Sequence, residues 1–465
     1  MSSLTKELIP NFQTDTIAAI ATPLGVAGIG IVRVSGPSAK LVAAKVFPGH
    51  KNLRPRYVYY GDVVSAVTPG KVLDDGCVVL FEGPKSFTGE DVVEIQTHSS
   101  HFILKQVLNS VLACGCRLAG PGEFTKRAFI NGKIDLTKSE SIIDLIHATS
   151  EKSHAVALSH LKGRLFSHIS ELRQSLVGSL EQIEASIDFP DEVEGVERPS
   201  LIDRIEAHID DLDQILSIQD YGEVVHSGVT CLIVGKPNVG KSSLLNAFLG
   251  KDRAIVTDVP GTTRDFLEGV IDLNGLHFRL IDTAGMRKSD NPIEKMGIKK
   301  AEDLLEGAHV IFFMLDGSRD VSVEDRDIMA RIGDRESVYI LINKTDCDQN
   351  LALAELPINP SWPVFSISAK TQAGMEKVRL QLIKDFVEKI EGIDLDLLCN
   401  VRQIYCLEKV KLSLVGVLEG LSGGFEDDVL SIDLKEAILV LGEITGDSFT
   451  EEMLDGIFSR FCIGK

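Results

Sequence analysis

The chain has 465 residues, 44% of them hydrophobic and 25% charged, so it is too long for one compact core and two to four domains are expected. Its 48 Lys and Arg against 68 Asp and Glu give a formal charge of -20, which disfavours long-range attraction to nucleic acid unless local basic patches exist. No segment is apolar for long enough to span a bilayer. The first residues lack a secretory signal, so we expect a cytoplasmic protein.

The eight cysteines do not form a zinc-binding pattern. No pair has CxxC spacing, and Cys114 and Cys116, the closest pair, have no second pair to complete a site. In a reducing compartment we expect most of the eight to be small, buried, apolar residues.

The predicted elements change in kind along the chain. Residues 1–130 mix short β-branched runs with Gly and Pro turns, which indicates an α+β domain with a helix over 101–113. Over 135–187, and again over roughly 201–219, apolar residues recur every three or four positions. This spacing is typical of long helices.

An α/β pattern begins near residue 227, where short apolar strands alternate with helical segments, and it predicts a mostly parallel sheet. Helical stretches flank this unit, so we expect it to be inserted into a helical domain. The expected fold is therefore multidomain, with an α+β domain over 1–130, the two parts of a discontinuous all-α domain over 131–226 and 390–465, and an inserted α/β domain over 227–389.

A phosphate-binding loop follows the first strand of the α/β unit. Residues 235–242 read G-x-x-x-x-G-K-S between a predicted strand and a predicted helix, the context that this motif requires. Backbone N–H groups would surround the phosphates, Lys241 would reach the β- and γ-phosphates, and Ser242 would hold Mg²⁺.

Three further motifs follow strands in the expected order. DTAG at 282–285 offers a carboxylate to the Mg²⁺ shell and a glycine close to the γ-phosphate. NKTD at 343–346 ends on a carboxylate that can accept two hydrogen bonds from guanine N1–H and its amine, which selects GTP over ATP. SAK at 368–370 can offer a backbone N–H to guanine O6. Together the four motifs predict a P-loop G domain.

Two details narrow the kind of G domain. Met286 stands where many regulatory GTPases carry the glutamine that orients water, so the water-orienting group must come from elsewhere. Thr263 is a natural second Mg²⁺ ligand. Asn238 and carbonyl groups of the loop 257–262 could hold a monovalent cation that supplies positive charge. A role for Asn238 in turn geometry alone remains an alternative.

Several blocks carry a resemblance to a known family. The segments GIGIVRVSG, SFTGEDVVEIQTH, GPGEFTKRAFINGKIDLTKSE, GKPNVGKSS, AIVTDVPGTTRD, IDTAGMR and the terminal FCIGK together resemble the MnmE (TrmE) family of tRNA-modification GTPases, over essentially the whole chain. The resemblance implies an N-terminal folate-binding domain, a discontinuous helical domain and an inserted Ras-like G domain.

The resemblance also implies partners and chemistry. Family members form a homodimer through the N-terminal domain and a heterotetramer with the flavoprotein MnmG (GidA). Together they add an aminomethyl or carboxymethylaminomethyl group to C5 of the wobble uridine of certain tRNAs. The one-carbon donor is 5,10-methylene- or 5-formyl-tetrahydrofolate, and hydrolysis of GTP depends on K⁺ and Mg²⁺.

The motifs and the resemblance together assign individual residues to the expected binding sites. The motifs and the resemblance give as GTP-binding residues Asn238, Val239, Gly240, Lys241, Ser242, Ser243, Thr257, Thr262, Thr263, Asp282, Thr283, Ala284, Gly285, Asn343, Lys344, Asp346, Ser368, Ala369 and Lys370. The resemblance implies K⁺ ligands at Asn238, Thr257, Val259 and Thr262, Mg²⁺ ligands at Ser242 and Thr263, a water-orienting Glu294, and folate contacts at Arg33, Glu94, Lys133 and Lys465.

Without the resemblance, Glu294 would be interpreted as a solvated residue at a helix start, and the folate residues as surface ion pairs. Two other functions remain alternatives. One is a ribosome-assembly or regulatory GTPase, and the other is a folate-binding scaffold whose chemistry resides in a partner.

The segment FCIGK raises a separate question. A helix is expected to begin within 447–452 and to place Leu454, Ile457, Phe458 and Phe461 on one face, which would hold Cys462 in a fixed place. The resemblance implies that this place lies beside the folate pocket at the dimer interface. There the thiol could attack C6 of uridine or act as an acid or base. The alternative is a buried thiol that only fills space.

Overall fold

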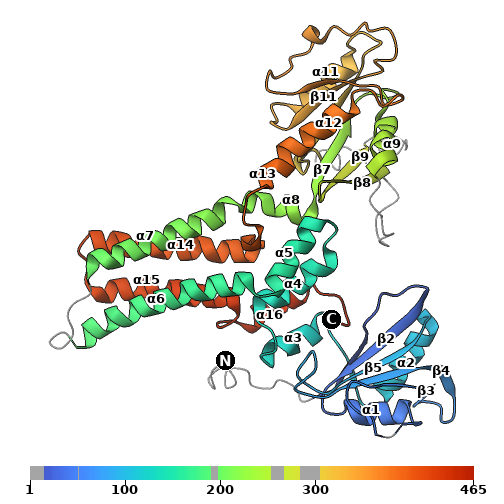
Figure 1. Ribbon diagram of the computed structural model, residues 1–465, viewed down its shortest axis with the longest axis vertical. Helices are drawn as coiled ribbons and strands as arrows, with labels where there is room; N and C mark the ends of the chain where they lie inside the picture. The colour runs from blue at the N-terminus through green and yellow to red at the C-terminus, as the bar shows by residue number, and fades with distance from the viewer. Residues whose placement is uncertain (1–14, 51, 190–196, 253–266, 283–303) are drawn as a thin grey trace. The chain divides into compact units, whose positions relative to one another are not determined.

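The computed structural model describes residues 15–50, 52–189, 197–252, 267–282 and 304–465 (Figure 1). The chain divides into two compact units. Unit 1 comprises Met1–Ile146, Leu158–Asp213 and Val401–Lys465, and unit 2 comprises His147–Ala157 and Gln214–Asn400. The chain thus passes from unit 1 into unit 2 twice, at His147 and at Gln214, and returns to unit 1 each time. Within the described ranges, no helix is long and apolar enough to cross a membrane.

Unit 1 begins with a six-stranded sheet in the spatial order β3-β4-β5-β2-β1-β6. Neighbouring strands are antiparallel except β1 and β6, which are parallel. The strands are β1 (Ile17–Ile20), β2 (Ala27–Ser35), β3 (Val58–Val64), β4 (Val72–Phe81), β5 (Val92–Ser99) and β6 (Arg117–Leu118). The α+β character predicted for this segment is confirmed.

The two faces of this sheet carry different kinds of side chain. Every second side chain packs into a core with α1 (Ala39–Val46) and α2 (His101–Ala113), which confirms the helix predicted over 101–113. On β2 the core side chains are Val32 and Val34, so Arg33 between them points to the opposite face. Arg33 stands in register with Glu94 of β5. The face away from the helices therefore carries charged groups.

The rest of unit 1 is helical. Its helices are α3 (Glu123–Ile130), α6 (Arg164–Asp188), α14 (Val401–Ser422), α15 (Asp427–Thr445) and α16 (Glu451–Phe458). Three further helices contribute residues to both units, namely α4 (Leu136–His147), α5 (Glu151–Leu161) and α7 (Arg198–Ser217). The segment 135–187, predicted to be helical, forms three separate helices. Reciprocal hydrogen bonds between Ser150 and Ser153 mark the start of α5, and Gly163 adopts φ +90° just before α6.

Unit 2 contains a second six-stranded sheet in the order β12-β11-β10-β7-β9-β8. Its strands are β7 (Val229–Val234), β8 (Leu267–Leu273), β9 (Leu276–Asp282), β10 (Val310–Asp316), β11 (Val338–Asn343) and β12 (Val364–Ser366), and all neighbours are parallel except β8 and β9. The helices are α8 (Gly222–Ser227), α9 (Lys241–Asp252), α11 (Val323–Ile332), α12 (Met375–Leu382) and α13 (Glu388–Ile390), with a π-helix over Ile383–Val387. The predicted parallel α/β sheet is confirmed.

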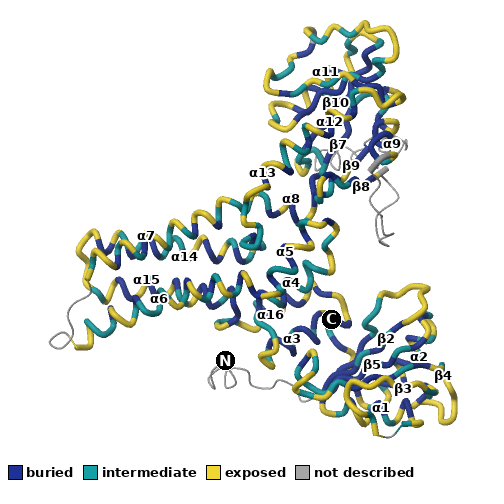
Figure 2. Tube along the Cα trace, in the orientation of Figure 1, coloured by how far each residue is buried: buried dark blue, intermediate teal, exposed yellow. Residues whose placement is uncertain are grey.

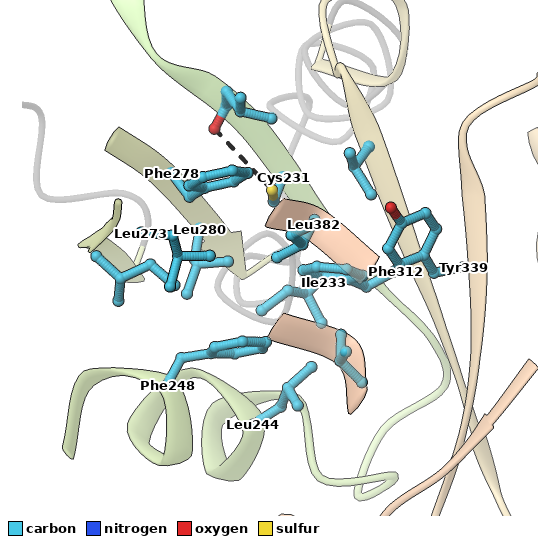
Figure 3. Packing of buried hydrophobic residues seen from close by; sticks show 14 of the residues in the cluster. Cys231, Ile233, Leu244, Phe248, Leu273, Phe278, Leu280, Phe312, Tyr339 and Leu382 are labelled. Carbon is cyan, nitrogen blue, oxygen red and sulfur yellow. Dashed lines mark hydrogen bonds between the residues drawn. The ribbon is translucent and has the colours of Figure 1, made fainter. Parts of the chain in front are cut away.

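A hydrophobic core packs against each face of this sheet. Figure 3 shows one face, where Phe248 of α9 stacks on Phe312 of β10 with ring centroids 5.9 Å apart. On the other face, Met329 and Ile332 of α11 pack against Phe313. All seven residues of β10 are buried, as its dark trace in Figure 2 indicates. A strand buried on both faces carries a continuous apolar run, and its carboxyl end is therefore fixed in position.

The prediction that most cysteines are buried is wrong for half of them. Four are buried, Cys77 and Cys114 are half-buried, and Cys347 and Cys462 are exposed. Burial raises the pKa of the Cys116 thiol to about 11, and it also raises the pKa of Cys231. These two thiols are therefore poor nucleophiles at neutral pH.

Candidate functional site

The P-loop connects β7 to α9, and its glycines pack closely against neighbouring segments. A Cβ on Gly240, where φ is +107°, would lie 2.3 Å from Nδ2 of Asn343, and one on Gly235 would lie 2.7 Å from the Met314 carbonyl oxygen. Asn238 adopts a left-handed φ of +63°, a conformation that asparagine tolerates better than most residues. The two glycines are therefore required by close approach, and Asn238 serves turn geometry whatever else it binds.

The groups expected to face the phosphates contact one another. The Lys241 ammonium donates to the carbonyl oxygens of Gly235 and Lys236 at 2.9 and 3.0 Å. The Ser242 hydroxyl donates to the fully buried Asp282 carboxylate at 2.8 Å. A hydroxyl and a carboxylate oxygen so close together are hard donors that suit Mg²⁺. The residues present therefore fit the metal.

Asn343 ties the phosphate and base regions together. Its amide nitrogen donates to the Val239 carbonyl at 2.8 Å, and its amide oxygen accepts from the Ala369 backbone N–H at 2.9 Å. One side chain thereby links the P-loop, the NKTD motif and the SAK motif. Together with the contact of Ser242 with Asp282, the structure thus brings together residues of all four motifs that the sequence singled out.

Asp346 is ready to accept from a guanine base. Its side chain is exposed, and a hydrogen bond of 2.6 Å from the Ser368 hydroxyl lowers the pKa of the carboxyl group below its ordinary value. The carboxylate therefore remains ionised at neutral pH and keeps acceptor capacity for two donors. Lys370, the last SAK residue, is also exposed.

Sequence reasoning missed Asp316, which braces the NKTD loop. It ends β10 and accepts from the Lys344 ammonium at 2.6 Å, while Lys344 holds a left-handed φ of +67°. Burial by itself would raise the pKa of Asp316, but the hydrogen bonds from Lys344 and Ser318 lower it overall. The sequence feature that could have indicated Asp316 is a carboxylate at the end of an otherwise apolar strand, at the same edge of the sheet as the motifs.

Sequence reasoning also missed a contact between the P-loop and α11. Lys236, a variable position of the motif, donates to the buried Asp325 carboxylate at 2.7 Å. Asp325 also completes a capping box with Ser322 at the start of α11. The start of α11 therefore fixes one side of the phosphate loop.

Eight of the predicted site residues lie outside the residues that the structure describes. They are Thr257, Val259, Thr262, Thr263, Thr283, Ala284, Gly285 and Glu294. Of the residues predicted to hold K⁺ the structure describes Asn238, and of the Mg²⁺ ligands it describes Ser242. Ser243 is exposed in the first turn of α9.

A second cluster forms on the charged face of the unit 1 sheet. Arg33 donates to Glu94 through Nε at 3.0 Å and through Nη2 at 2.9 Å, and its Nη1 donates to the Gly464 carbonyl at 3.2 Å. The guanidinium carbon lies 5.8 Å from the ring centroid of Phe124. Arg33 therefore joins β5, α3 and the segment FCIGK in one place.

The segment 461–465 is docked onto the sheet and α3. The Cys462 carbonyl accepts from Gly122 N–H at 3.4 Å, and the Lys465 carbonyl accepts from Phe124 N–H at 3.2 Å. Gly464 has φ +98°, and a Cβ there would lie 2.3 Å from the Ile20 carbonyl oxygen. Glycine is thus required at this position.

The expected helix before this segment is present but shorter than predicted. Thr450 caps α16 by accepting from Met453 N–H. The helix ends at Phe458, so Phe461 lies beyond it, although it is buried against Phe458. Cys462 is exposed, so the interpretation as a buried space-filling thiol is wrong.

The four predicted folate residues fall into two groups. Arg33, Glu94 and the backbone of Lys465 meet around α3, as described above. Lys133 is exposed, and its ammonium donates to the Pro84 carbonyl at 2.8 Å. The structure therefore brings three of the four together and attaches the fourth to the loop that follows β4.

A buried arginine that the sequence analysis did not single out organises this region. Arg127 is 4% exposed and binds three carboxylates, those of Asp15, Glu90 and Glu123. Burial would lower the pKa of the guanidinium, but the three carboxylates raise it overall. Arg127 thereby fixes α3 against the loop between β4 and β5. Burial of a residue inside the polar block FTKR has no local sequence signal.

Two family models match the chain. The model described as "GTP-binding protein TrmE N-terminus" matches residues 16–133, and "MnmE helical domain" matches residues 136–462. The chain is also 42% identical over 460 residues to the tRNA modification GTPase MnmE of Syntrophus aciditrophicus, covering 97% of this chain and 99% of that one. The chain belongs to the MnmE family.

Other relatives are similar over the same length. Proteins named tRNA modification GTPase MnmE from Natranaerobius thermophilus and Desulforamulus reducens are 40% and 41% identical, each with 97% of this chain and 99% of the relative covered. Among solved structures, the chain is similar to the G domain of the T. maritima FeoB iron transporter, with 26% identity, 34% of this chain and 97% of that chain covered, and a TM-score of 0.27. The family, and not this structural likeness, shows that the chain is a GTPase.

Proposed function

We propose that this MnmE-family GTPase modifies C5 of the wobble uridine of certain tRNAs in the cytoplasm. It would act with the flavoprotein MnmG as a heterotetramer, and add an aminomethyl or carboxymethylaminomethyl group. The observation that carries this proposal is the presence, in one chain, of a guanine-nucleotide site and of a separate charged site where Arg33 and Glu94 meet the segment FCIGK. A ribosome-assembly or regulatory GTPase would have no use for the second site.

For GTP hydrolysis, we assign Mg²⁺ to Ser242 and Thr263, with Asp282 orienting the serine hydroxyl at 2.8 Å. We assign K⁺ to the Asn238 side chain with groups of Thr257, Val259 and Thr262. Bound cations supply positive charge to the phosphate oxygens in the transition state. Glu294 would orient the attacking water, since Met286 has no group able to do so.

For the one-carbon donor, we assign a pocket for 5,10-methylene- or 5-formyl-tetrahydrofolate to Arg33, Glu94, Lys133 and Lys465. A pterin presents a ring amide and an amine, from which a carboxylate such as Glu94 can accept hydrogen bonds. Arg33 holds that carboxylate in place at 2.9 Å, and the lysines suit the glutamate tail or a formyl oxygen. We expect the homodimer to form through residues 1–130.

The exposed thiol of Cys462 suits a chemical role. It lies on the docked segment next to the Arg33 contact, where it could attack C6 of uridine or move a proton. Cys462→Ser should abolish modification while tetrahydrofolate binding and GTP hydrolysis continue. Modification by the serine variant would exclude an essential thiol.

Reconstitution tests the whole proposal. The chain, MnmG, GTP, the tetrahydrofolate derivative and unmodified tRNA are combined, and the tRNA nucleosides are analysed by mass. We expect a mass increase on the wobble uridine that requires every component, and replacement of K⁺ by Na⁺ should slow hydrolysis. An unmodified wobble uridine in the complete mixture would reject the proposal.

A further inference from the structure

Charge is distributed unevenly along this acidic chain. Residues 16–133 contain thirteen Lys and Arg against eight Asp and Glu, whereas the whole chain carries -20. The N-terminal sheet region is therefore a basic part of an acidic molecule. Any binding of a polyanion should begin there, because the remaining surface repels it.

Several of these basic residues are exposed and lack an acidic partner. Arg54, Arg56 and Lys85 are exposed and form no ion pair with any described residue. Arg56 donates through Nη2 to the Lys85 carbonyl at 3.0 Å, and its backbone N–H donates to the Leu80 carbonyl at 2.7 Å. The three residues lie at one end of the β3–β4 hairpin, where β3 begins and β4 ends.

The carboxylates of the loop between β4 and β5 are held by other basic or polar groups. Glu82 and Asp91 both bind the Lys40 ammonium, at 2.5 and 3.1 Å. Glu90 is held by Arg127 and by the Ser35 hydroxyl. The positive charge of Arg54, Arg56 and Lys85 therefore remains available to an external anion.

Two exposed aromatic rings lie close to these charges in the chain. Tyr57 follows Arg56 and is 58% exposed, and Phe87 lies two residues after Lys85 and is 40% exposed. The Tyr57 ring is braced edge-on by Tyr59 at 4.9 Å, which in turn contacts His50 at 4.9 Å. The chain of rings leads to the fully buried Phe47. The Tyr57 ring therefore packs edge-on against one neighbour and remains more than half exposed.

We propose that Arg54, Arg56, Tyr57, Lys85 and Phe87, here called the basic-aromatic patch, bind a single-stranded RNA loop. Rings that stack on unpaired bases beside cations that contact the phosphates are the means by which proteins bind unpaired RNA. A double helix would offer phosphates but keep its bases stacked away from the rings. A second copy of this chain fits poorly, because a two-fold contact would set like charges against each other.

This inference rests on the proposed function and makes it more specific. The Pro84 carbonyl, next to Lys85 in the chain, accepts from the Lys133 ammonium. A loop held on the patch would thus lie beside one of the residues proposed to bind the one-carbon donor. A wobble uridine lies in such a loop, so the patch would hold the substrate tRNA by its anticodon loop.

The charge contribution is tested by salt dependence. The full-length chain is titrated with an anticodon stem-loop RNA at several salt concentrations. Arg54→Ala/Arg56→Ala/Lys85→Ala should reduce the slope of log Kd against log salt by about 0.7 for each cation that no longer neutralises a phosphate, or about 2 in all. The matched control, Lys45→Ala/Lys71→Ala/Lys105→Ala, removes the same charge from exposed residues on α1, the far end of the β3–β4 hairpin and α2, and should leave the slope unchanged.

The stacking contribution is tested separately. Tyr57→Ala and Phe87→Ala should each weaken stem-loop binding by roughly 5- to 150-fold, while Tyr57→Phe, which keeps the ring, binds normally. Binding of a blunt duplex RNA should not respond to either alanine variant. Equal weakening by both triple variants, or stem-loop binding that ignores the aromatic changes, would overturn the patch.

Two further outcomes are informative. If the patch variants dissociate the homodimer in sedimentation, the occupant is a second copy and the proposal fails. If the stem-loop does not bind the parent chain, the patch also fails, whereas the proposed function is decided independently by nucleoside analysis in the reconstituted reaction. The calorimetric unfolding transition of unit 1, expected at the parent's temperature for each variant, shows that the N-terminal sheet remains folded.

Discussion

At the scale of single residues, Asp346 is the group that we expect to select guanine. Replacement by asparagine removes an ionised acceptor and introduces an amide donor. Since hydrogen bonds to a charged group are stronger than those to a neutral one, we expect Asp346→Asn to weaken GTP binding by roughly 10²- to 10⁴-fold and to improve binding of xanthosine triphosphate. Fluorescent nucleotide titration measures both. Asp348→Asn, an exposed acid two residues away, should bind GTP normally.

Asp316 gives a prediction that depends on pH. Its pKa is lowered in the folded chain, so its contribution to stability is complete above the unfolded value of about 3.9 and is lost as pH falls through the lower, folded value. Asp316→Asn should therefore cost roughly 1.5–3 kcal/mol at pH 7, and the difference from the parent should shrink below about pH 4.

Urea unfolding followed by the fluorescence of Trp362, the single tryptophan and a buried residue of unit 2, measures this difference. Asp320→Asn, an exposed acid nearby in the chain, is the control. A pH-independent difference between the parent and Asp316→Asn would show that the Lys344 contact does not stabilise the fold.

At the scale of elements, one ion pair joins α4 to α14. Glu140 accepts from Arg402 at 2.8 and 2.9 Å and from Gln403 at 2.7 Å, and it is 8% exposed. Removing one partner leaves an unpaired buried charge, so Glu140→Ala should lower the free energy of unfolding by about 3–5 kcal/mol. Helical circular dichroism during denaturation provides the measurement.

The double variant Glu140→Leu/Arg402→Met removes both charges and is the matched control. It should lie closer to the parent than Glu140→Ala does, because neither charge is left unpaired. A double variant as unstable as the single one would mean that packing, rather than charge, sets the cost.

The segment 461–465 offers a test by paired glycines. Gly464→Ala places a Cβ 2.3 Å from the Ile20 carbonyl at a left-handed φ, whereas Gly456 on α16 has open space around it. We expect Gly464→Ala to release the segment, so that carboxypeptidase removes Lys465 faster and tetrahydrofolate binds more weakly. Gly456→Ala should keep the segment docked and gain up to about 1 kcal/mol of stability. Equal digestion of both would contradict the docking.

The elements that could be predicted are those whose signal is local. The apolar run of β10 and the capping threonine of α16 lie within a few residues of the elements they define. The contacts of Arg402 with Glu140 and of Arg33 with Gly464 span 262 and 431 positions. No local periodicity or motif indicates which residues form such contacts, because the contacts exist only once the fold brings the elements together.

The same distinction applies to the candidate site. The P-loop, NKTD and SAK residues were predictable because each motif follows its own strand. Asp316 and Arg127 were not, since a charged residue that is buried by tertiary contacts resembles a solvated one in the sequence. The residues assigned to K⁺, Asn238 among them, together with Thr263 and Glu294, remain predictions.

At the scale of the whole molecule, the two units should unfold separately. Each has its own core, so a single two-state transition is not expected. A non-hydrolysable GTP analogue binds unit 2, and at 100 times its Kd it should stabilise that unit by about 2.7 kcal/mol. Calorimetry should show one transition move to higher temperature and the other stay in place. A tetrahydrofolate derivative should move the other transition, and joint movement would contradict independent units.

The discontinuity of unit 1 has a consequence for synthesis on the ribosome. The apolar side of α6, with Leu165, Ile169 and Leu172, is covered by α15, yet residues 214–400 are made between the two helices. At about 5–20 residues per second, the segment between the end of α6 at Asp188 and the start of α15 at Asp427 takes roughly 12–48 s to make. The nascent chain exposes the apolar side of α6 during this time, while the G domain folds. Chaperones that bind apolar helices should therefore engage α6 during this interval and leave once α15 has emerged.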